Sequence, residues 1–388
     1  GTTSEHNSFT GAAREVTVDT TKKTVVVHDG SQAGGTPLMK ESGGTTNATI
    51  NSVNIGKGAN SVAGNTVLGE TALDASVSGG SNTAIGKDVL TVNTSGANNT
   101  AVGAYALDAN TTASDNTAMG KAALSNNTTG ASNTAVGKDT LVANTEGDEN
   151  VAVGGVSLDA NTTGNENTAI GYATLSANTT ASYNVAVGKS AMALNTTGTQ
   201  NVAVGAYALD TNTTADSNTS IGYNSLTANT TGGNNTALGT WALEDNTTGH
   251  SNVGLGVAAL ANNTTAINNT AVGRDALYAN TTGTENVAVG ASALDANSTG
   301  GYNIGVGSSA LGSNTTANYN VGVGHYALGA NTTGTNNVAV GFGSLDANTT
   351  ASNNTAVGHQ TLTANVTGIQ NTGIGGFSLY ANTASYNT

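Results

Sequence analysis

Aromatic side chains that could contact a ligand gather in the later part of this chain. Thirteen of its fifteen Phe, Trp and Tyr residues lie beyond residue 171. Flat rings of this kind stack on sugar rings or form contact spots between proteins. Two interpretations stay open, namely contact with a glycan or protein ligand, and packing between copies of the chain. The candidate contacts are Tyr172, Tyr207, Tyr223, Trp241, Tyr302, Tyr319, Tyr326, Phe342 and Phe377.

The titratable residues do not form a pattern that predicts catalysis. The five histidines show no metal-ligand spacing, and the acidic pair Asp148–Glu149 occurs once. Asp follows the repeated Leu in some repeats only, whereas a calcium ladder needs oxygen ligands in every repeat. A glycan-cleaving enzyme needs a pair of carboxylates across a groove, and the sequence offers no such pair. We therefore predict no catalytic residue, no cofactor and no metal site, and hence a protein that is not an enzyme.

Composition narrows the class of protein further. The 388 residues include 53 Gly and no Cys, only 9% are charged, and the net charge is −14. A chain this acidic is a poor binder of nucleic-acid phosphates. Without Cys it has no disulfides, and no apolar run reaches the roughly 20 residues of a membrane-spanning helix. The composition thus leaves a structural or binding protein with an unusual architecture.

A short repeat without insertions accounts for this composition. From Gly69 to Gly375 a Gly stands at every seventeenth position, which gives nineteen repeats. Asn stands four positions before each Gly, and Leu stands four positions after it, with Met192 as the one exception. The unit reads N-(T/V)-A-(V/I)-G-x-x-A-L-x-A-N-T-T-(G/A)-x-x. Asn, Thr and Gly are poor helix formers, so the fold class predicted is all-β, a parallel β-solenoid with one coil per repeat.

Each column of the repeat has an expected role. Gly marks a left-handed backbone or a close approach of two backbones, and stacked Asn side chains are expected to form amide ladders. Because side chains alternate along a strand, we expect the β-branched residues of N-(T/V)-A-(V/I)-G to face inward. The small residue between them would then face outward, where it suits close contact with another copy of the chain. This inter-protomer column is predicted to include Ala84, Ala101, Ala118, Ala135, Ala152, Ala169, Ala186 and Ala203.

The sequence before Asn65 departs from the repeat. Residues 14–19 and 24–30 alternate like two strands of a hairpin, joined by a turn at residues 20–23. Residues 43–64 repeat on a shorter step of thirteen to fourteen positions. We predict a small N-terminal β domain that attaches the chain to something (1–42), a transition coil (43–64) and a solenoid shaft (65–388). The register stops abruptly near Thr388, which leads us to expect further C-terminal sequence.

The stretch from Gly1 to Gly30, with its R-E-V-T-V-D and T-V-V-V-H-D-G strands, resembles the N-terminal domain of phage tail fibres of the major-tropism-determinant type. The N-T-A-V-G-x-x-A-L repeats are similar to arrays in other phage tail fibres and to the heads of trimeric autotransporter adhesins. The resemblance implies a homotrimeric fibre located in a virion tail, outside the cell. It also implies tail or baseplate partners for residues 1–42, a host-surface glycan or protein as receptor, and a self-cleaving chaperone after the shaft.

Two other functions stay open. A bacterial trimeric surface adhesin would have similar repeats, but should also carry a signal peptide and a membrane anchor. An ice-binding solenoid is the less favoured reading, since N-T-T recurs in almost every coil and Thr arrays can order water. The hairpin at residues 14–30 favours the phage fibre.

Overall fold

The computed structural model describes residues 16–20, 24–27, 36–37, 48–75 and 78–388. The chain divides into two compact units, Gly1–Thr163 and Gly164–Thr388. Each unit is treated by itself below, and each contains parallel coils of the predicted kind.

The first unit begins with a small antiparallel sheet. Strand β1 (Val16–Asp19) pairs with β2 (Thr24–Val27), and β2 pairs with β3 (Thr36–Pro37). The predicted pairing of the two strands is thus confirmed, while residues 21–23 of the predicted turn and the flanking residues 14–15 and 28–30 lie outside the described residues. The proposed extent of this domain, 1–42, stays a prediction.

The segment predicted as a transition coil contains a hairpin. Strand β4 (Ala48–Ile50) pairs antiparallel with β5 (Val53–Gly56), and β5 pairs antiparallel with the first strand of the solenoid. Asn51 and Ser52 make the tight turn, because both adopt left-handed backbone angles, with φ of 50° and 69°. A short 3-10 helix, Ala59–Ser61, follows. The hairpin covers a sheet edge that would otherwise expose unpaired backbone groups.

From β6 onward every strand of the first unit is parallel to the next, and each residue pairs with its equivalent one repeat later. The strands are β6 (Thr66–Gly69), β7 (Thr83–Ile85), β8 (Thr100–Val102), β9 (Thr117–Met119), β10 (Thr134–Val136) and β11 (Val151–Val153).

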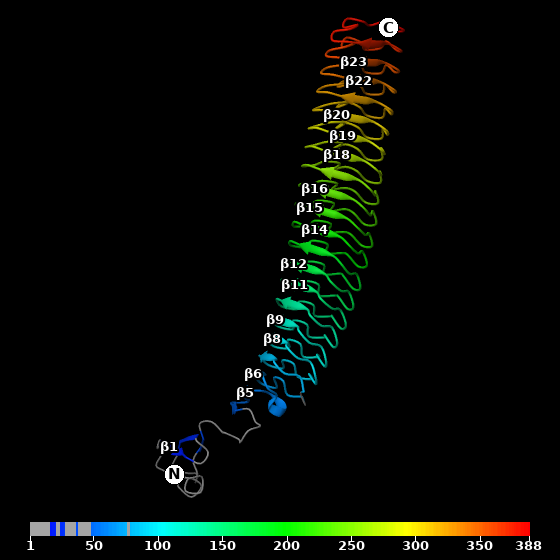
Figure 1. The fold of residues 1–388 in the computed structure, drawn as a ribbon. Coiled ribbons are helices and arrows are strands. Elements are labelled where there is room, and N and C mark those ends of the chain that lie inside the picture. The colour runs from blue at the N-terminus through cyan, green and yellow to red at the C-terminus, as the bar shows by residue number, and fades with distance from the viewer. Residues whose placement is uncertain (1–15, 21–23, 28–35, 38–47, 76–77) are drawn as a thin grey trace. The chain divides into compact units, whose positions relative to one another are not determined.

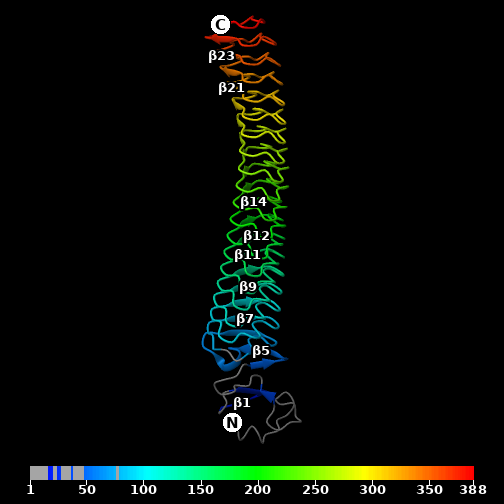
Figure 2. The ribbon, with the colours of Figure 1, turned by 90° about the vertical axis from the view of Figure 1, so that its right-hand side faces the viewer.

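The second unit is built in the same way, and Figures 1 and 2 show its strands stacked one per coil. The predicted solenoid is therefore confirmed in both units. The strands are β12 (Thr168–Ile170), β13 (Val185–Val187), β14 (Val202–Val204), β15 (Thr219–Ile221), β16 (Thr236–Leu238), β17 (Val253–Leu255), β18 (Thr270–Val272), β19 (Val287–Val289), β20 (Ile304–Val306), β21 (Val321–Val323), β22 (Val338–Val340), β23 (Thr355–Val357) and β24 (Thr372–Ile374).

Both reasons expected for the repeated Gly are present. Gly290 has a backbone φ of about 135°, a conformation that residues other than Gly rarely adopt. A Cβ on it would also lie 2.6 Å from the carbonyl carbon of Gly307 in the next coil. Either condition alone would select Gly, so this column fixes both the bend and the stacking distance.

Two ladders of buried Asn side chains run through the coils. In one, the Asn269 backbone N–H donates to Oδ1 of Asn252 at 3.0 Å, and its Nδ2 donates to the Gly283 carbonyl at 2.9 Å. In the other, Nδ2 of Asn263 donates to Oδ1 of Asn246 at 2.7 Å. These side chains have no exposed surface. Because the side-chain amides hydrogen-bond to neighbouring coils, the buried polar groups have partners and the ladders link successive coils in one network.

The predicted orientation of the strands is wrong. The middle residue of each repeat strand points inward: Ala84, Ala101, Ala118, Ala135, Ala152, Ala169, Ala186 and Ala203 have no exposed surface within the single chain. These Ala residues therefore cannot form an inter-protomer column. The physical reason is the narrow interior, which the repeated Leu already fills. A Cβ on Gly322 would lie 3.2 Å from Cγ of Leu311, so the strand contributes only Ala, Gly or Ser in nearly every coil.

Candidate functional site

Two of the outward surfaces of each coil could bind another molecule. The first surface, called here the strand face, consists of the first and last residues of each three-residue strand. In the coil of Gly290, for example, these are Val287 and Val289. The second, called the post-glycine columns, consists of the first, second and fifth residues after the Gly. The strand face repeats similar residues in every coil, whereas the post-glycine columns vary.

The strand face is a strip with one apolar column, just before the Gly, and a second column of Thr and β-branched apolar residues. Its β-branched residues project outward because the inward strand position belongs to Ala. In the second unit Ile170, Leu238 and Ile304 are 40%, 41% and 40% exposed. Ile170 and Leu238 stand just before the Gly, whereas Ile304 belongs to the other outward column, which holds Thr or Val in the remaining coils of this unit. Contiguous exposed apolar surface beyond a few hundred Å² is uncommon on monomers and usually marks a contact with another molecule.

The post-glycine columns carry many of the bulky and charged side chains. Their second position has a left-handed backbone, for example φ of 60° at Trp241 and 57° at Asp275. This conformation turns the chain at the corner and leaves the side chain at the surface. The residue type is therefore free of the packing limits that select Gly, Leu and Asn elsewhere in the repeat.

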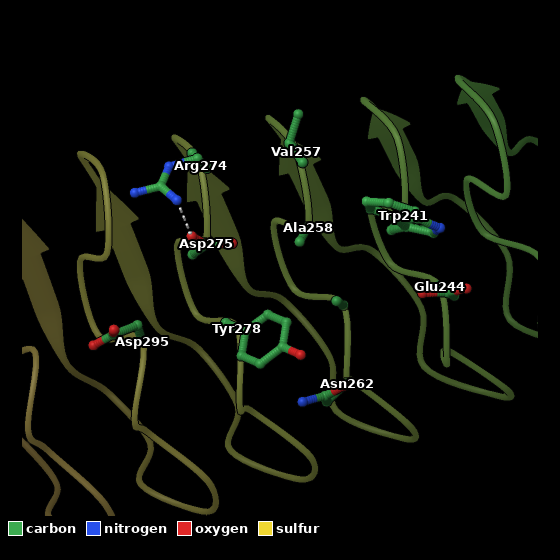
Figure 3. Close-up of a pocket in the computed structure, with 10 residues that line it drawn as sticks. Trp241, Glu244, Val257, Ala258, Asn262, Arg274, Asp275, Tyr278 and Asp295 are labelled. Carbon is green, nitrogen blue, oxygen red and sulfur yellow. Dashed lines mark ion pairs between the residues drawn. The ribbon is translucent and has the colours of Figure 1, made fainter.

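These columns form a surface depression of about 520 Å³ around the coil of Gly256 (Figure 3). That coil carries Ala258 and Ala261, which are only 8% and 4% exposed and form the floor. Large side chains of the neighbouring coils form the sides. Trp241 lies toward one end, and Tyr278 lies on the opposite side of Ala258. The depression is lined by Trp241, Glu244, Val257, Ala258, Ala261, Asn262, Arg274, Asp275, Tyr278 and Asp295.

The lining has an excess of negative charge. It contains three carboxylates and one cation, and the guanidinium of Arg274 is held 3.0 Å from the carboxylate of Asp275. Burial raises the pKa of Asp295, an effect that backbone hydrogen bonds partly oppose. Burial also raises the pKa of Glu244, and the neighbouring charge of Asp245 adds to this effect. Glu244 and Asp295 are therefore partly desolvated hydrogen-bond acceptors.

The candidate aromatic contacts do not form one site. Of the nine, Trp241 alone borders the depression. Tyr207 and Tyr223 meet edge to face at 6.2 Å, and Tyr302 and Tyr319 stack at 5.1 Å in the column before the buried Asn. The exposed fraction of Tyr172 is 61%. These residues thus lie at several places along the second unit, and the choice between ligand contact and packing between copies stays a prediction.

A further cluster occupies the last coils. The ring of Phe342 lies between His325 and His359, with centroids 5.7 and 5.3 Å apart and interplanar angles of 19° and 12°. Tyr326 packs on His325, and Phe377 packs on His359. An imidazole therefore stacks on each side of Phe342, and 49% of the residue stays exposed. A sugar ring that stacked on a face of Phe342 would compete with one of these imidazoles.

The sequence pattern did not single out Tyr278 and Glu244. Both stand at the fifth position after a Gly, a column in which Asp is frequent and whose pattern suggests metal ligands rather than ligand contacts. The signal that identifies them is a contrast between coils: Ala258 and Ala261 are small at positions where both neighbouring coils carry large residues. Such a gap becomes visible only when the repeats are aligned as stacked coils.

Two kinds of feature are absent from the described residues. No group of three or more His, Asp or Glu residues there is placed to hold a metal ion. Over the same residues, no helix combines the length and apolar character needed to cross a membrane.

Comparison with known proteins gives matches at the N-terminus. Residues 1–32 match the family model described as the major tropism determinant N-terminal domain. A stretch of 40 residues is 70% identical to a tail fiber receptor-binding protein of Bordetella phage BPP-1. This match covers 10% of the present chain and 10% of that protein, so the chain matches only about a tenth of its relative's length. The coils after residue 64 lie outside the match to the family model.

Proposed function

We propose that this chain is an adhesive fibre of a phage tail, located in the virion and projecting a repetitive shaft that contacts the host surface. The observation that carries the proposal is the N-terminal match to a tail fiber receptor-binding protein, at 70% identity. The parallel coils support it, because hydrogen bonds and Asn ladders between successive coils suit a rigid, extended shaft. In this proposal the chain binds and does not catalyse.

Residues 1–42 are proposed to attach the fibre to tail or baseplate proteins. The family match falls on these residues and stops before the coils. A domain that this chain has in common with other tail fibres suits a common role, which is attachment to the tail. The coils, which lie outside that match, suit a different host contact. A bacterial surface adhesin is the alternative, and the N-terminal match argues for the phage fibre.

Immunogold electron microscopy would test this assignment. Antibodies against the post-glycine columns of the second unit are expected to label the tails of virions from a culture that produces this chain. Labelling of the bacterial surface, with unlabelled virions, would support the adhesin and refute the fibre.

We further propose that copies of the chain associate through their strand faces. The strip carries an exposed or half-exposed apolar residue just before the Gly in every coil, and its spacing of about 4.8 Å per coil is the spacing between hydrogen-bonded strands. A partner that matches it over many coils must have the same repeat, and a second copy of the chain satisfies this condition. A homotrimer is the state that the resemblance implies.

Sedimentation of the full chain tests this association. A sedimentation-equilibrium mass three times that of the 37.8 kDa chain is expected. A stable monomer at micromolar concentration would refute association through the strand face, whereas another multiple would refute only the trimer.

A further inference from the structure

The depression around Gly256 combines features that together select a class of ligand. Trp241 and Tyr278 are 42% and 43% exposed, so each ring offers surface to solvent. The two residues belong to coils that are two steps apart, or roughly 9–10 Å at the usual strand spacing. Between them lies a floor of Ala258 and Ala261. The shape suits a flat, rigid ligand that lies across the coils.

The negative charge of the lining further restricts the class of ligand. Glu244 and Asp295 accept hydrogen bonds and repel anions, while the one cation of the lining, Arg274, is already paired with Asp275. A sialic acid, uronic acid or phosphate would therefore meet uncompensated negative charge. Hydroxyl groups donate well to carboxylates, and hydrogen bonds to a charged acceptor are the stronger kind.

We propose that this depression binds a neutral saccharide, with pyranose rings against Trp241 and Tyr278 and hydroxyl groups donating to Glu244 and Asp295. The inference rests on the proposed adhesive function and specifies its receptor class. A basic peptide would also find aromatic rings and carboxylates here. A flexible peptide, however, loses more conformational entropy on binding to a shallow surface than a rigid sugar ring does.

The chain itself supplies the probe, because Trp241 is its only Trp. The full chain would be titrated with neutral oligosaccharides of glucose, galactose, mannose and N-acetylglucosamine while the fluorescence of Trp241 is followed. Sialyllactose and a short oligolysine peptide are the comparison ligands. We expect a saturable change with at least one neutral oligosaccharide and none with the other two.

Variants locate the binding. Tyr278→Ala is expected to weaken the apparent Kd about tenfold or more through the lost ring contact. Ala258→Leu should abolish binding by filling the floor. Leu is compatible with the left-handed backbone of Ala258, since the repeated Leu adopts it in other columns, as at Leu243 with φ of 53°. Ala173→Leu, in the same column but five coils away, is the matched control and should bind like the parent.

Several outcomes would overturn the inference. These are no fluorescence change with any neutral saccharide up to its solubility limit, a change with oligolysine alone, or saccharide binding that Ala258→Leu leaves intact. Circular dichroism would verify that each variant keeps its coils. The outcome is separate from the immunogold result: labelled tails without saccharide binding refute only this inference, and saccharide binding with unlabelled tails refutes only the fibre.

Discussion

The strand face and the post-glycine columns belong to the same coils but differ in how they vary. Along the second unit the strand face offers Thr or Val and then Val, Ile or Leu, with Ile304 as a small departure. The post-glycine columns change from Trp241 to Ala258 to Asp275 in three successive coils. A uniform surface suits a partner with the same period. A variable surface suits ligands that each touch a few coils.

The difference has a common cause in the interior. Backbone angle, interior volume and hydrogen bonding determine the residue types in the Gly, Leu, Asn and middle Ala columns. These columns can therefore vary little from coil to coil. The strand face must still form a strand, which favours β-branched residues. The corner after the Gly is free of both requirements, as is the turn just before the buried Asn, where Tyr302 and Tyr319 lie. Local recognition can therefore be placed there without disturbing the stack.

The largest expected effect separates the inside of a strand from its outside. Ala237 is fully buried, whereas the next residue, Leu238, is 41% exposed. Ala237→Asp should place an unpaired charge in the interior, at a cost of several kcal/mol. Hydrogen exchange of the amides in β15–β17 should rise sharply. Leu238→Asp should leave these amides protected, and equal exchange in the two variants would contradict the observed orientation.

The next effect tests what the strand face contacts. Ile221→Lys combined with Leu238→Lys and Leu255→Lys should dissociate the full chain into monomers, because three charges would enter an apolar interface. Sedimentation would measure the change. The matched control places the same three charges in the post-glycine columns, as Tyr223→Lys, Thr240→Lys and Val257→Lys. Association that survives the first triple variant, or is lost equally in both, would contradict the assigned interface.

A smaller effect is expected from the aromatic cluster at the last coils. Phe342→Ala removes two stacked ring contacts, and aromatic pairs contribute roughly 0.5–1.5 kcal/mol each. The amides of β21–β23 should exchange several-fold faster, measured in the same way as for β15–β17. Tyr172→Ala is the control, since Tyr172 is 61% exposed and should change local exchange little. An unchanged rate in Phe342→Ala would favour a ligand-binding role over packing.

Periodicity made most of this fold predictable. The Gly, Asn and Leu columns indicated the coil length, the parallel register and the Asn ladders. The orientation of the strand was not predictable by the usual rule, which places β-branched residues inside. Volume decides it instead: the interior holds one Leu per coil, and a Cβ on Gly254 would already lie 3.4 Å from Cγ of Leu243. That limit depends on the distance between segments, which sequence periodicity does not contain.

The same limit explains how much of the candidate site the sequence could indicate. Trp241 was identifiable as an unusual residue in a variable column. Its surroundings were not, because the floor arises from the absence of bulk at Ala258 and Ala261. A contrast among residues one repeat apart becomes a surface feature only once the coils are stacked in register.

The smallest effect concerns pH and the fifth post-glycine column. Burial raises the pKa of Asp108, Asp159, Asp210 and Asp346 as well as that of Asp295. Among the described residues, one carboxylate oxygen of Asp108 and one of Asp159 are buried without a hydrogen-bond partner. The folded chain thus binds these protons more tightly than the unfolded chain does. Their contribution to stability is fully present below the unfolded pKa and is lost as the pH rises through the folded pKa.

The first unit therefore offers a sharp test with Asp159→Asn. Between about pH 4 and pH 7 this variant should lose less stability than the parent, because its amide needs no proton to stay neutral. The thermal unfolding midpoint of the full chain, measured across that range, should show a shallower slope. Glu285→Gln, at an exposed position, removes the same charge and should leave the slope nearly unchanged. If both variants reduce the slope of the unfolding midpoint against pH equally, net charge rather than burial would govern the pH response. The partial burial of the fifth post-glycine column would then have no measurable effect on stability.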